Sequence, residues 1–179
     1  MDHADHVALL APAAARSPDA VWADIGAGSG AFTLALADLL GPAARIIAVD
    51  RDRAALAANA RAVAAAFPDT RLTSLVADFR EPLDLPLLDG LVAANSLHFV
   101  ARGGQVAVIK SLAAHLRPGG AFVVVEYDAD NGNPWVPHPF SAGSWPRLAG
   151  NAGLVDSEVM GRVPSRFLRA IYSARAQKA

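Results

Sequence analysis

The sequence predicts an α/β protein: a doubly wound, mostly parallel seven-stranded sheet with helices on both faces and an antiparallel C-terminal hairpin strand. Three observations support this fold. Short apolar runs alternate with helical stretches over residues 20–127, which is typical of βαβ units. Three alternate glycines, Gly26, Gly28 and Gly30, stand where the first strand passes into a helix. Two apolar runs without a helix between them close the chain, which indicates an antiparallel pair.

The composition fits a single folded domain over residues 1–179. Hydrophobic residues make up 53% of the 179 residues, which excludes a disordered chain. The net charge is −1, so no general field attracts nucleic acid or an anionic membrane. The absence of cysteine excludes a thiolate metal site and a cysteine nucleophile. With no secretory signal and no apolar run of about 20 residues, we expect a cytoplasmic protein.

The first half of the chain supplies two strands and three helices. The expected elements are a helix over 7–17, a strand over 21–24, a helix over 31–40, a strand over 45–50 and a helix ending at Phe67-Pro68. Gly41-Pro42 should stop the second helix, because glycine favours the C-cap and proline cannot continue a helix. Asp52 is well placed to cap the third helix.

The second half completes the sheet and adds a long loop. The expected elements are strands over 71–77, 89–95 and 121–127, a helix over 104–116 and a turn over 117–120. A short helix capped by Ser144 should precede two strands, 154–160 and 167–173, joined by a tight turn at Val163-Pro164. We expect residues 1–19 to form a helical cap and residues 128–145 to form a lid or a substrate loop.

The glycine turn predicts a cofactor of nucleotide type. Glycine permits positive φ and close ligand approach, and the free N–H groups of a helix start favour polar ligand groups. Gly26, Gly28 and Ala31 also fit a dinucleotide fingerprint with Asp50 as the ribose acid, so an NAD(P)-dependent oxidoreductase is an alternative. Against it, the Asp24 carboxylate would oppose a pyrophosphate. Neither lysine follows a tyrosine four positions earlier, as a Tyr-x-x-x-Lys pair requires.

The ordered series of motifs resembles the class I S-adenosylmethionine-dependent methyltransferases. Asp24–Gly30 looks like the glycine-rich first motif of that family. Asp50 and Asp78 match the acids after the second and third strands, and Leu116–Gly120 matches the turn before the fifth. The resemblance spans about residues 20–127. It implies S-adenosylmethionine as cofactor and S-adenosylhomocysteine as product.

The resemblance also implies a role for each site residue. Asp50 would accept both ribose hydroxyls, Asp78 the adenine amino group, and the Phe79 N–H would reach a ring nitrogen. The glycine turn would hold the methionine part, with Asp24 near its ammonium. An acid after a strand can instead serve only as a helix cap. The residues expected at the cofactor are Asp24, Gly26, Ala27, Gly28, Gly30, Asp50, Arg51, Asp78, Phe79 and Asn95.

The candidates for catalysis follow the fourth and fifth strands. A general base is needed only if the methyl acceptor must lose a proton, and His98 and Glu126 are the residues placed for that role. A structural role stays open for both. Tyr127, Trp135 and His138 are the candidates for substrate contact.

The sequence also offers two further groups of charged and polar residues. Asp128, Asp130 and Asn131 could ligate a hard cation, but Asn95 stands where metal-dependent members of the family carry an acid, so we expect no metal. Arg162, Arg166 and Arg169 could bind an anionic substrate, but we expect a solvated face.

These features predict a methyltransferase that acts on an O or N atom of a small molecule. No nucleic-acid or membrane partner is expected, because the chain has no basic stripe and no Asn/Asp-Pro-Pro-aromatic motif. A non-catalytic S-adenosylmethionine-binding partner or regulatory subunit is the main alternative, and the oxidoreductase is the other. The sequence leaves open whether the protein forms a homodimer or joins a partner subunit.

Overall fold

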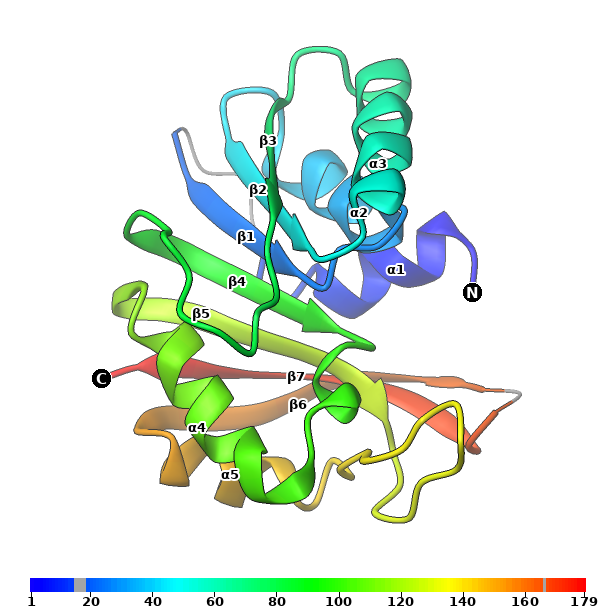
Figure 1. The fold of residues 1–179 in the computed structure, drawn as a ribbon, viewed down its shortest axis with the longest axis vertical. Helices are drawn as coiled ribbons and strands as arrows, with labels where there is room; N and C mark the ends of the chain where they lie inside the picture. Colours follow the sequence, from blue (N-terminus) through cyan, green and yellow to red (C-terminus); the bar gives the residue numbers. More distant parts are fainter. Residues whose placement is uncertain (15–18, 166) are drawn as a thin grey trace.

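The computed structural model describes residues 1–14, 19–165 and 167–179, and it confirms the predicted fold. One seven-stranded sheet has the order β3-β2-β1-β4-β5-β7-β6, and β7 runs antiparallel to both of its neighbours (Figure 1). The strands are β1 (Val21–Ile25), β2 (Arg45–Asp50), β3 (Arg71–Val76), β4 (Leu88–Ala94), β5 (Leu116–Tyr127), β6 (Leu154–Pro164) and β7 (Ala170–Lys178). The helices are α1 (His3–Leu10), α2 (Ala31–Leu40), α3 (Arg53–Ala66), α4 (Arg102–Ala113), α5 (Trp145–Asn151) and the short 3₁₀ helix η1 (Leu97–Phe99).

Helices cover both faces of the sheet. The helices α1, α2 and α3 lie on one face and α4 and α5 on the other (Figure 1). Successive residues of a strand point to opposite faces, so Ala23 and Ile25 pack with α4 and α5, whereas Trp22 packs with α1 and α2. The parallel strands β1, β2, β4 and β5 are buried on both faces, which explains their unbroken apolar runs.

Two of the predicted helix ends are confirmed. The Asp52 carboxylate accepts the N–H groups of Ala54 and Ala55 at the start of α3, at 2.8 and 3.1 Å. Gly41 ends α2 with a φ of 81° and donates its N–H to the carbonyl of Ala37. Ser144 directly precedes α5, as predicted. Its hydroxyl donates to Asp130 and makes no bond to the helix, so the prediction that Ser144 caps α5 was wrong.

The first helix begins earlier than the sequence predicts. Asp2 and Asp5 form a reciprocal capping box, in which each carboxylate accepts the backbone N–H of the other residue at 3.0 Å. α1 therefore starts at His3 and ends at Leu10, and the expected bounds of 7–17 were wrong. Residues 15–18 lie outside the described residues.

The other corrected bounds lie in the second half. α4 covers 102–113 instead of 104–116, and β5 begins at Leu116, so residues 117–120 belong to that strand. This early segment of β5 pairs Leu116 with Leu88 before a register shift, with Gly119 at a φ of 76°. The last two strands are longer than predicted, and Val163 and Pro164 lie within β6, so the expected turn at these two residues was wrong.

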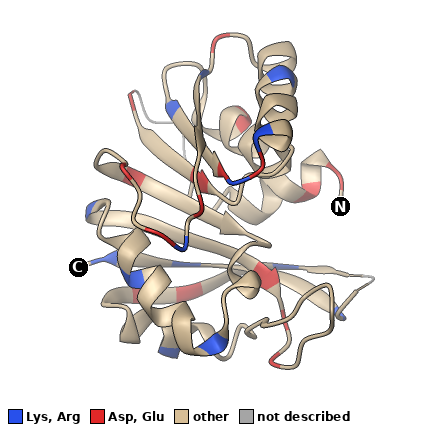
Figure 2. Cartoon of the chain, in the orientation of Figure 1, with Lys and Arg blue, Asp and Glu red and all other residues tan. Residues whose placement is uncertain are grey.

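The charged residues are distributed over many elements. Lys and Arg are spread over the ribbon, with Arg45 and Arg71 as neighbours at the start of β2 and β3 (Figure 2). Among the described residues, no helix has the length and apolar character needed to cross a membrane.

Candidate functional site

The glycine turn after β1 is shaped by three positive φ angles. Gly26, Gly28 and Gly30 have φ values of 74, 51 and 103°. A Cβ on Gly26 would lie 2.5 Å from the Cβ of Ser96, so this glycine allows the turn to approach the end of β4. A Cβ on Gly30 would lie 2.6 Å from Oδ1 of Asn59 on α3. A Cβ on Gly28 would meet nothing within 4 Å, which leaves the open side of the turn to a ligand.

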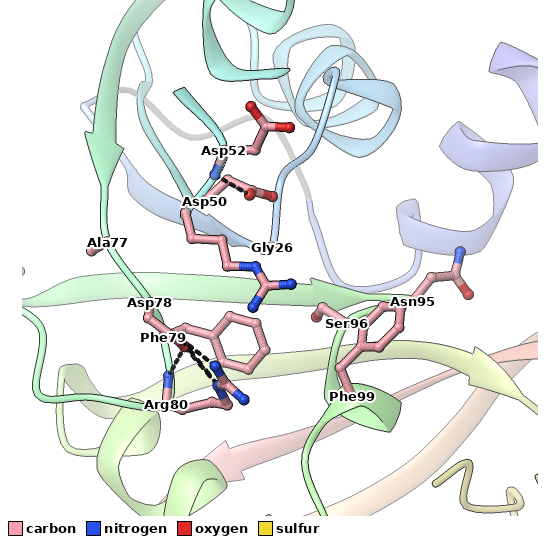
Figure 3. A pocket seen from close by; sticks show the side chains of 11 residues that line it. Gly26, Asp50, Asp52, Ala77, Asp78, Phe79, Arg80, Asn95, Ser96 and Phe99 are labelled. Carbon is pink, nitrogen blue, oxygen red and sulfur yellow. Dashed lines mark hydrogen bonds and ion pairs between the residues drawn. The ribbon is translucent and has the colours of Figure 1, made fainter. Parts of the chain in front are cut away.

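A cavity of about 410 Å³ opens at the carboxyl ends of β1, β2 and β4 (Figure 3). The residues that line it are Gly26, Asp50, Arg51, Asp52, Ala77, Asp78, Phe79, Arg80, Asn95, Ser96 and Phe99. It brings together six of the ten residues predicted for the cofactor. The other four, Asp24, Ala27, Gly28 and Gly30, do not line it.

Asp50 links the glycine turn to the end of β2. Its Oδ2 accepts the N–H of Gly28 at 2.8 Å, and its Oδ1 accepts the N–H of Asp52 at 2.9 Å. These two bonds fix the carboxylate at the rim of the cavity. Each oxygen has a second lone pair, so Asp50 can still accept two hydroxyl donors from a ligand.

Asp78 is already occupied by an arginine that the sequence did not indicate. The Arg80 Nη2 contacts Asp78 Oδ2 at 2.5 Å, and Nε donates to both carboxylate oxygens at 2.9 and 3.1 Å (Figure 3). The Arg80 N–H adds a bond of 3.0 Å. The Arg80 guanidinium holds the pKa of Asp78 down at about 2. A ligand amino group must therefore compete with Arg80 for this carboxylate.

Asp24 lies beneath the glycine turn in a buried polar chain. It is 1% exposed, and its Oδ2 accepts the hydroxyl of Thr33 at 2.6 Å. The amide of Asn59 donates to that hydroxyl at 2.8 Å. Burial is the main cause that raises the pKa of Asp24 to about 7, and the charge of Asp50 adds to it. Asp24 is therefore held inside the fold with Thr33 and Asn59, two residues that the sequence did not indicate.

The two catalytic candidates, His98 and Glu126, contact each other. His98 Nδ1 lies 2.9 Å from Oε2 of Glu126, and the His98 N–H donates to Oε1 at 3.2 Å. Their side chains are 3% and 0% exposed. Neither residue lines the cavity, but Ser96 and Phe99, on either side of His98 in the chain, both do. A neutral His98 that donates from Nδ1 keeps an acceptor lone pair on Nε2.

Of the three candidates for substrate contact, Tyr127 lines a second cavity, which is described below. Trp135 is 74% exposed. The His138 N–H donates to the carbonyl of His98 at 3.0 Å, and the buried amide of Gln105 donates to the His138 carbonyl at 2.8 Å. These bonds attach the loop to η1 and α4. The role of residues 128–145 as a lid stays a prediction. In this conformation the bonds of His138 hold the middle of the loop against η1 and α4.

The acids of that loop bind the protein itself. Asp130 accepts the N–H of Ser141 and the hydroxyls of Ser141 and Ser144, and these bonds lower its pKa. Asp128 accepts the Ala142 N–H and pairs with Arg162 at 3.2 Å. No cluster of three or more His, Asp or Glu suited to a metal ion occurs in the part of the chain that the structure describes. Arg166 is outside that part.

Comparison with known proteins identifies the family. A model of the methyltransferase domain matches residues 23–120, which include the glycine turn, Asp50, Asp78 and Asn95. The chain belongs to the class I S-adenosylmethionine-dependent methyltransferases. This membership gives S-adenosylmethionine as the cofactor and leaves the nicotinamide alternative without support. No curated protein sequence matches the chain.

Solved structures show the same fold at low identity. The N-methyltransferase NodS of Bradyrhizobium japonicum, solved with S-adenosylhomocysteine, is 18% identical, with a TM-score of 0.70; the match covers 98% of this chain and 85% of NodS. An O-methyltransferase family 2 protein of Planctomyces limnophilus, solved with apigenin, is 19% identical, with a TM-score of 0.72 and coverage of 98% and 57%. Human N-acetylserotonin methyltransferase, solved with S-adenosylmethionine, is 20% identical, with a TM-score of 0.66 and coverage of 89% and 47%. The chain thus spans about half the length of the last two.

The cavity fits the cofactor of the family. The free lone pairs of Asp50 suit a ligand that presents hydroxyl groups. The rings of Phe79 and Phe99 lie across the cavity from Asp50 (Figure 3) and offer apolar surface to a planar base. The Asn95 Oδ1 is buried without a hydrogen-bond partner among the described residues. These residues are able to hold an amino-acid-bearing nucleoside.

Proposed function

We propose that this protein transfers the methyl group of S-adenosylmethionine to an O or N atom of a small-molecule acceptor, with His98 as the general base. The observation that carries the proposal is the buried pair of His98 and Glu126, in which His98 stands between Ser96 and Phe99, two residues that line the cavity. A base is required when the acceptor atom carries a proton that must leave, as in a phenol or an amine.

The cofactor-binding roles follow the residues that line or support the cavity. Asp50 would accept the ribose hydroxyls, and Asp78 and the N–H of Phe79 would meet the adenine once Arg80 moves aside. The glycine turn and the buried Asp24 would support the methionine part. Bound S-adenosylmethionine supplies an electrophilic methyl group on a sulfonium, so the protein mainly has to align two reactants.

Glu126 is the residue that orients the base. Its carboxylate accepts Nδ1–H of His98, which selects the tautomer with a free lone pair on Nε2 and stabilises the imidazolium after proton transfer. Nε2 has no hydrogen-bond partner in the described part of the chain. The rings of Phe99 and Tyr127 flank the imidazole, with ring centroids at 4.3 and 5.8 Å, and shield it from water.

The experiment is an assay of S-adenosylhomocysteine release across phenols, amines and carboxylates. With an accepted substrate, His98→Gln should reduce kcat about 100-fold and remove the acidic limb of the pH profile, where wild type loses activity as the base becomes protonated, with S-adenosylhomocysteine affinity unchanged. A purely structural His98 would leave the shape of the pH profile intact. That result would remove His98 from catalysis.

A non-catalytic cofactor-binding role is the second candidate. The observation in its favour is the 3% exposure of the His98 side chain, which leaves little room for proton exchange. In that case the protein binds S-adenosylhomocysteine but releases none from S-adenosylmethionine with any acceptor class. Turnover with one acceptor excludes this role.

A further inference from the structure

We propose that a second cavity, beside the cofactor cavity, binds the methyl acceptor and takes a neutral aromatic compound of one or two rings. This inference rests on the proposed function and names the acceptor class of the same site. The second cavity has a volume of about 430 Å³, within the range of ligand pockets. The residues that line it are Met1, Asn95, Tyr127, Pro164, Ser165, Phe167 and Ile171.

Asn95 joins the two cavities, because it lines both of them. Its backbone is held in the left-handed region at a φ of 50°, and its N–H donates to the carbonyl of Val125 at 2.8 Å. The side chain points away from Asp78 and Arg80 (Figure 3), and its buried Oδ1 lacks a partner among the described residues. A displacement reaction needs its two reactants held close together, and cofactor and acceptor would lie on either side of Asn95.

Tyr127 connects the second cavity to the buried pair. Its ring meets the His98 ring edge to face at 5.8 Å, and it follows Glu126 directly in β5. Burial and the neighbouring Glu126 raise the pKa of Tyr127, so its hydroxyl stays protonated at neutral pH and can donate to an acceptor oxygen or nitrogen. Tyr127 therefore both lines the second cavity and contacts the ring of His98.

The remaining lining residues favour a flat apolar compound. Pro164 and Ser165 lie at the tip of the β6–β7 hairpin with Phe167, which is 68% exposed. A large aromatic side chain left in water is available to stack on a ligand ring. Ile171 adds aliphatic surface, whereas Ser165 and Asn95 provide the few polar groups that orient such a ligand.

The loop over 128–145 does not contribute to this cavity. Trp135 and His138 line neither of the two cavities, although both were expected to contact the substrate. The middle of that loop is instead bonded to η1 and α4 through His98 and Gln105. The structure thus assigns acceptor recognition to Pro164, Ser165 and Phe167 at the end of β6 and before β7.

The test is a fluorescence titration of 2-naphthol and 2-naphthoate into the full chain saturated with S-adenosylhomocysteine. These probes share one shape, but only 2-naphthol is neutral at pH 7. We expect 2-naphthol to bind at least about fivefold more tightly than 2-naphthoate. Phe167→Ala should weaken the binding of 2-naphthol about fivefold, which equals about 1 kcal/mol of ring stacking. Leu87→Ala, at an apolar residue before β4 that is 58% exposed, should leave both affinities unchanged.

Three outcomes would overturn the acceptor site. The first is tighter binding of 2-naphthoate than of 2-naphthol by wild type. The second is unchanged 2-naphthol affinity in Phe167→Ala, and the third is a loss of 2-naphthol affinity in Trp135→Ala. Failure of the wild type to bind S-adenosylhomocysteine would contradict the proposed function itself. Normal cofactor binding without Phe167-dependent 2-naphthol binding contradicts only the acceptor site.

Discussion

Replacing Asp24 by asparagine should change how the stability of the protein depends on pH. Burial raises the pKa of Asp24 from 3.8 to about 7. Between these two values the folded state keeps a proton that the unfolded chain releases, so the free energy of unfolding falls as pH rises and then levels off above pH 7. A difference of 3.2 pH units (7 − 3.8) corresponds to about 4 kcal/mol at most.

The part of this loss that falls between pH 5 and pH 8 is about 3 kcal/mol. Asp24→Asn keeps an acceptor oxygen for the Thr33 hydroxyl and does not titrate. Its added N–H donors lack a partner, which costs about 1 kcal/mol at both pH values. The stability of the variant relative to wild type should therefore rise by about 3 kcal/mol from pH 5 to pH 8.

Urea unfolding at pH 5 and pH 8, at constant ionic strength, measures this difference. Asp69→Asn, at an exposed position, is the matched control and should show no such change. A stability difference between wild type and Asp24→Asn that stays constant within about 0.5 kcal/mol would refute a buried, protonated Asp24.

Three other substitutions test the site. Gly26→Ala should cost about 2 kcal/mol or more in thermal unfolding, because of its φ of 74° and a Cβ contact of 2.5 Å, whereas Gly103→Ala, with nothing within 4 Å, should stabilise α4 by up to about 1 kcal/mol. Equal melting temperatures would contradict the tight turn. Arg80→Gln should raise the pKa of Asp78 from about 2 toward 3.8, seen by NMR titration, and strengthen S-adenosylhomocysteine binding about threefold. Weaker binding would assign Arg80 to the cofactor. Glu126→Ala should cost about 3 kcal/mol in urea unfolding by leaving a buried histidine unpaired, and Glu126→Gln, which keeps an acceptor oxygen, should cost less. Equal losses in the two variants would argue against the pair.

Local signals made most of the fold predictable. The glycine turn, the Asp52 cap and the Gly41 stop depend on residues close together in the chain, and all three occur in the structure. The carboxyl ends of parallel strands share one edge of a sheet, so the order of Asp50, Asp78 and Asn95 along the chain was enough to place them at one cavity.

The contacts that the sequence missed join distant parts of the chain. Thr33 on α2 bonds Asp24, and Asn59 on α3 bonds Thr33, through the packing of the two helices, which nothing in their own neighbourhood indicates. The contact of Arg80 with Asp78 is an exception, because it is local: the Arg80 N–H also bonds the Asp78 carboxylate two residues earlier, and an Asx turn of this kind could have indicated it. The bounds that failed in the sheet were set by pairing partners, as in the early part of β5 beside Leu88, whereas the start of α1 was set by the local capping box of Asp2 and Asp5.

Calorimetric titration of S-adenosylhomocysteine and of NADH into wild type and Asp50→Asn tests the assignment of the cavity. We expect wild type to bind S-adenosylhomocysteine and not NADH, and Asp50→Asn to bind it about tenfold more weakly, because an amide cannot accept both ribose hydroxyls with full charge. Binding of NADH in place of S-adenosylhomocysteine, or an unchanged affinity of Asp50→Asn for S-adenosylhomocysteine, would contradict the assignment of this cavity to S-adenosylmethionine.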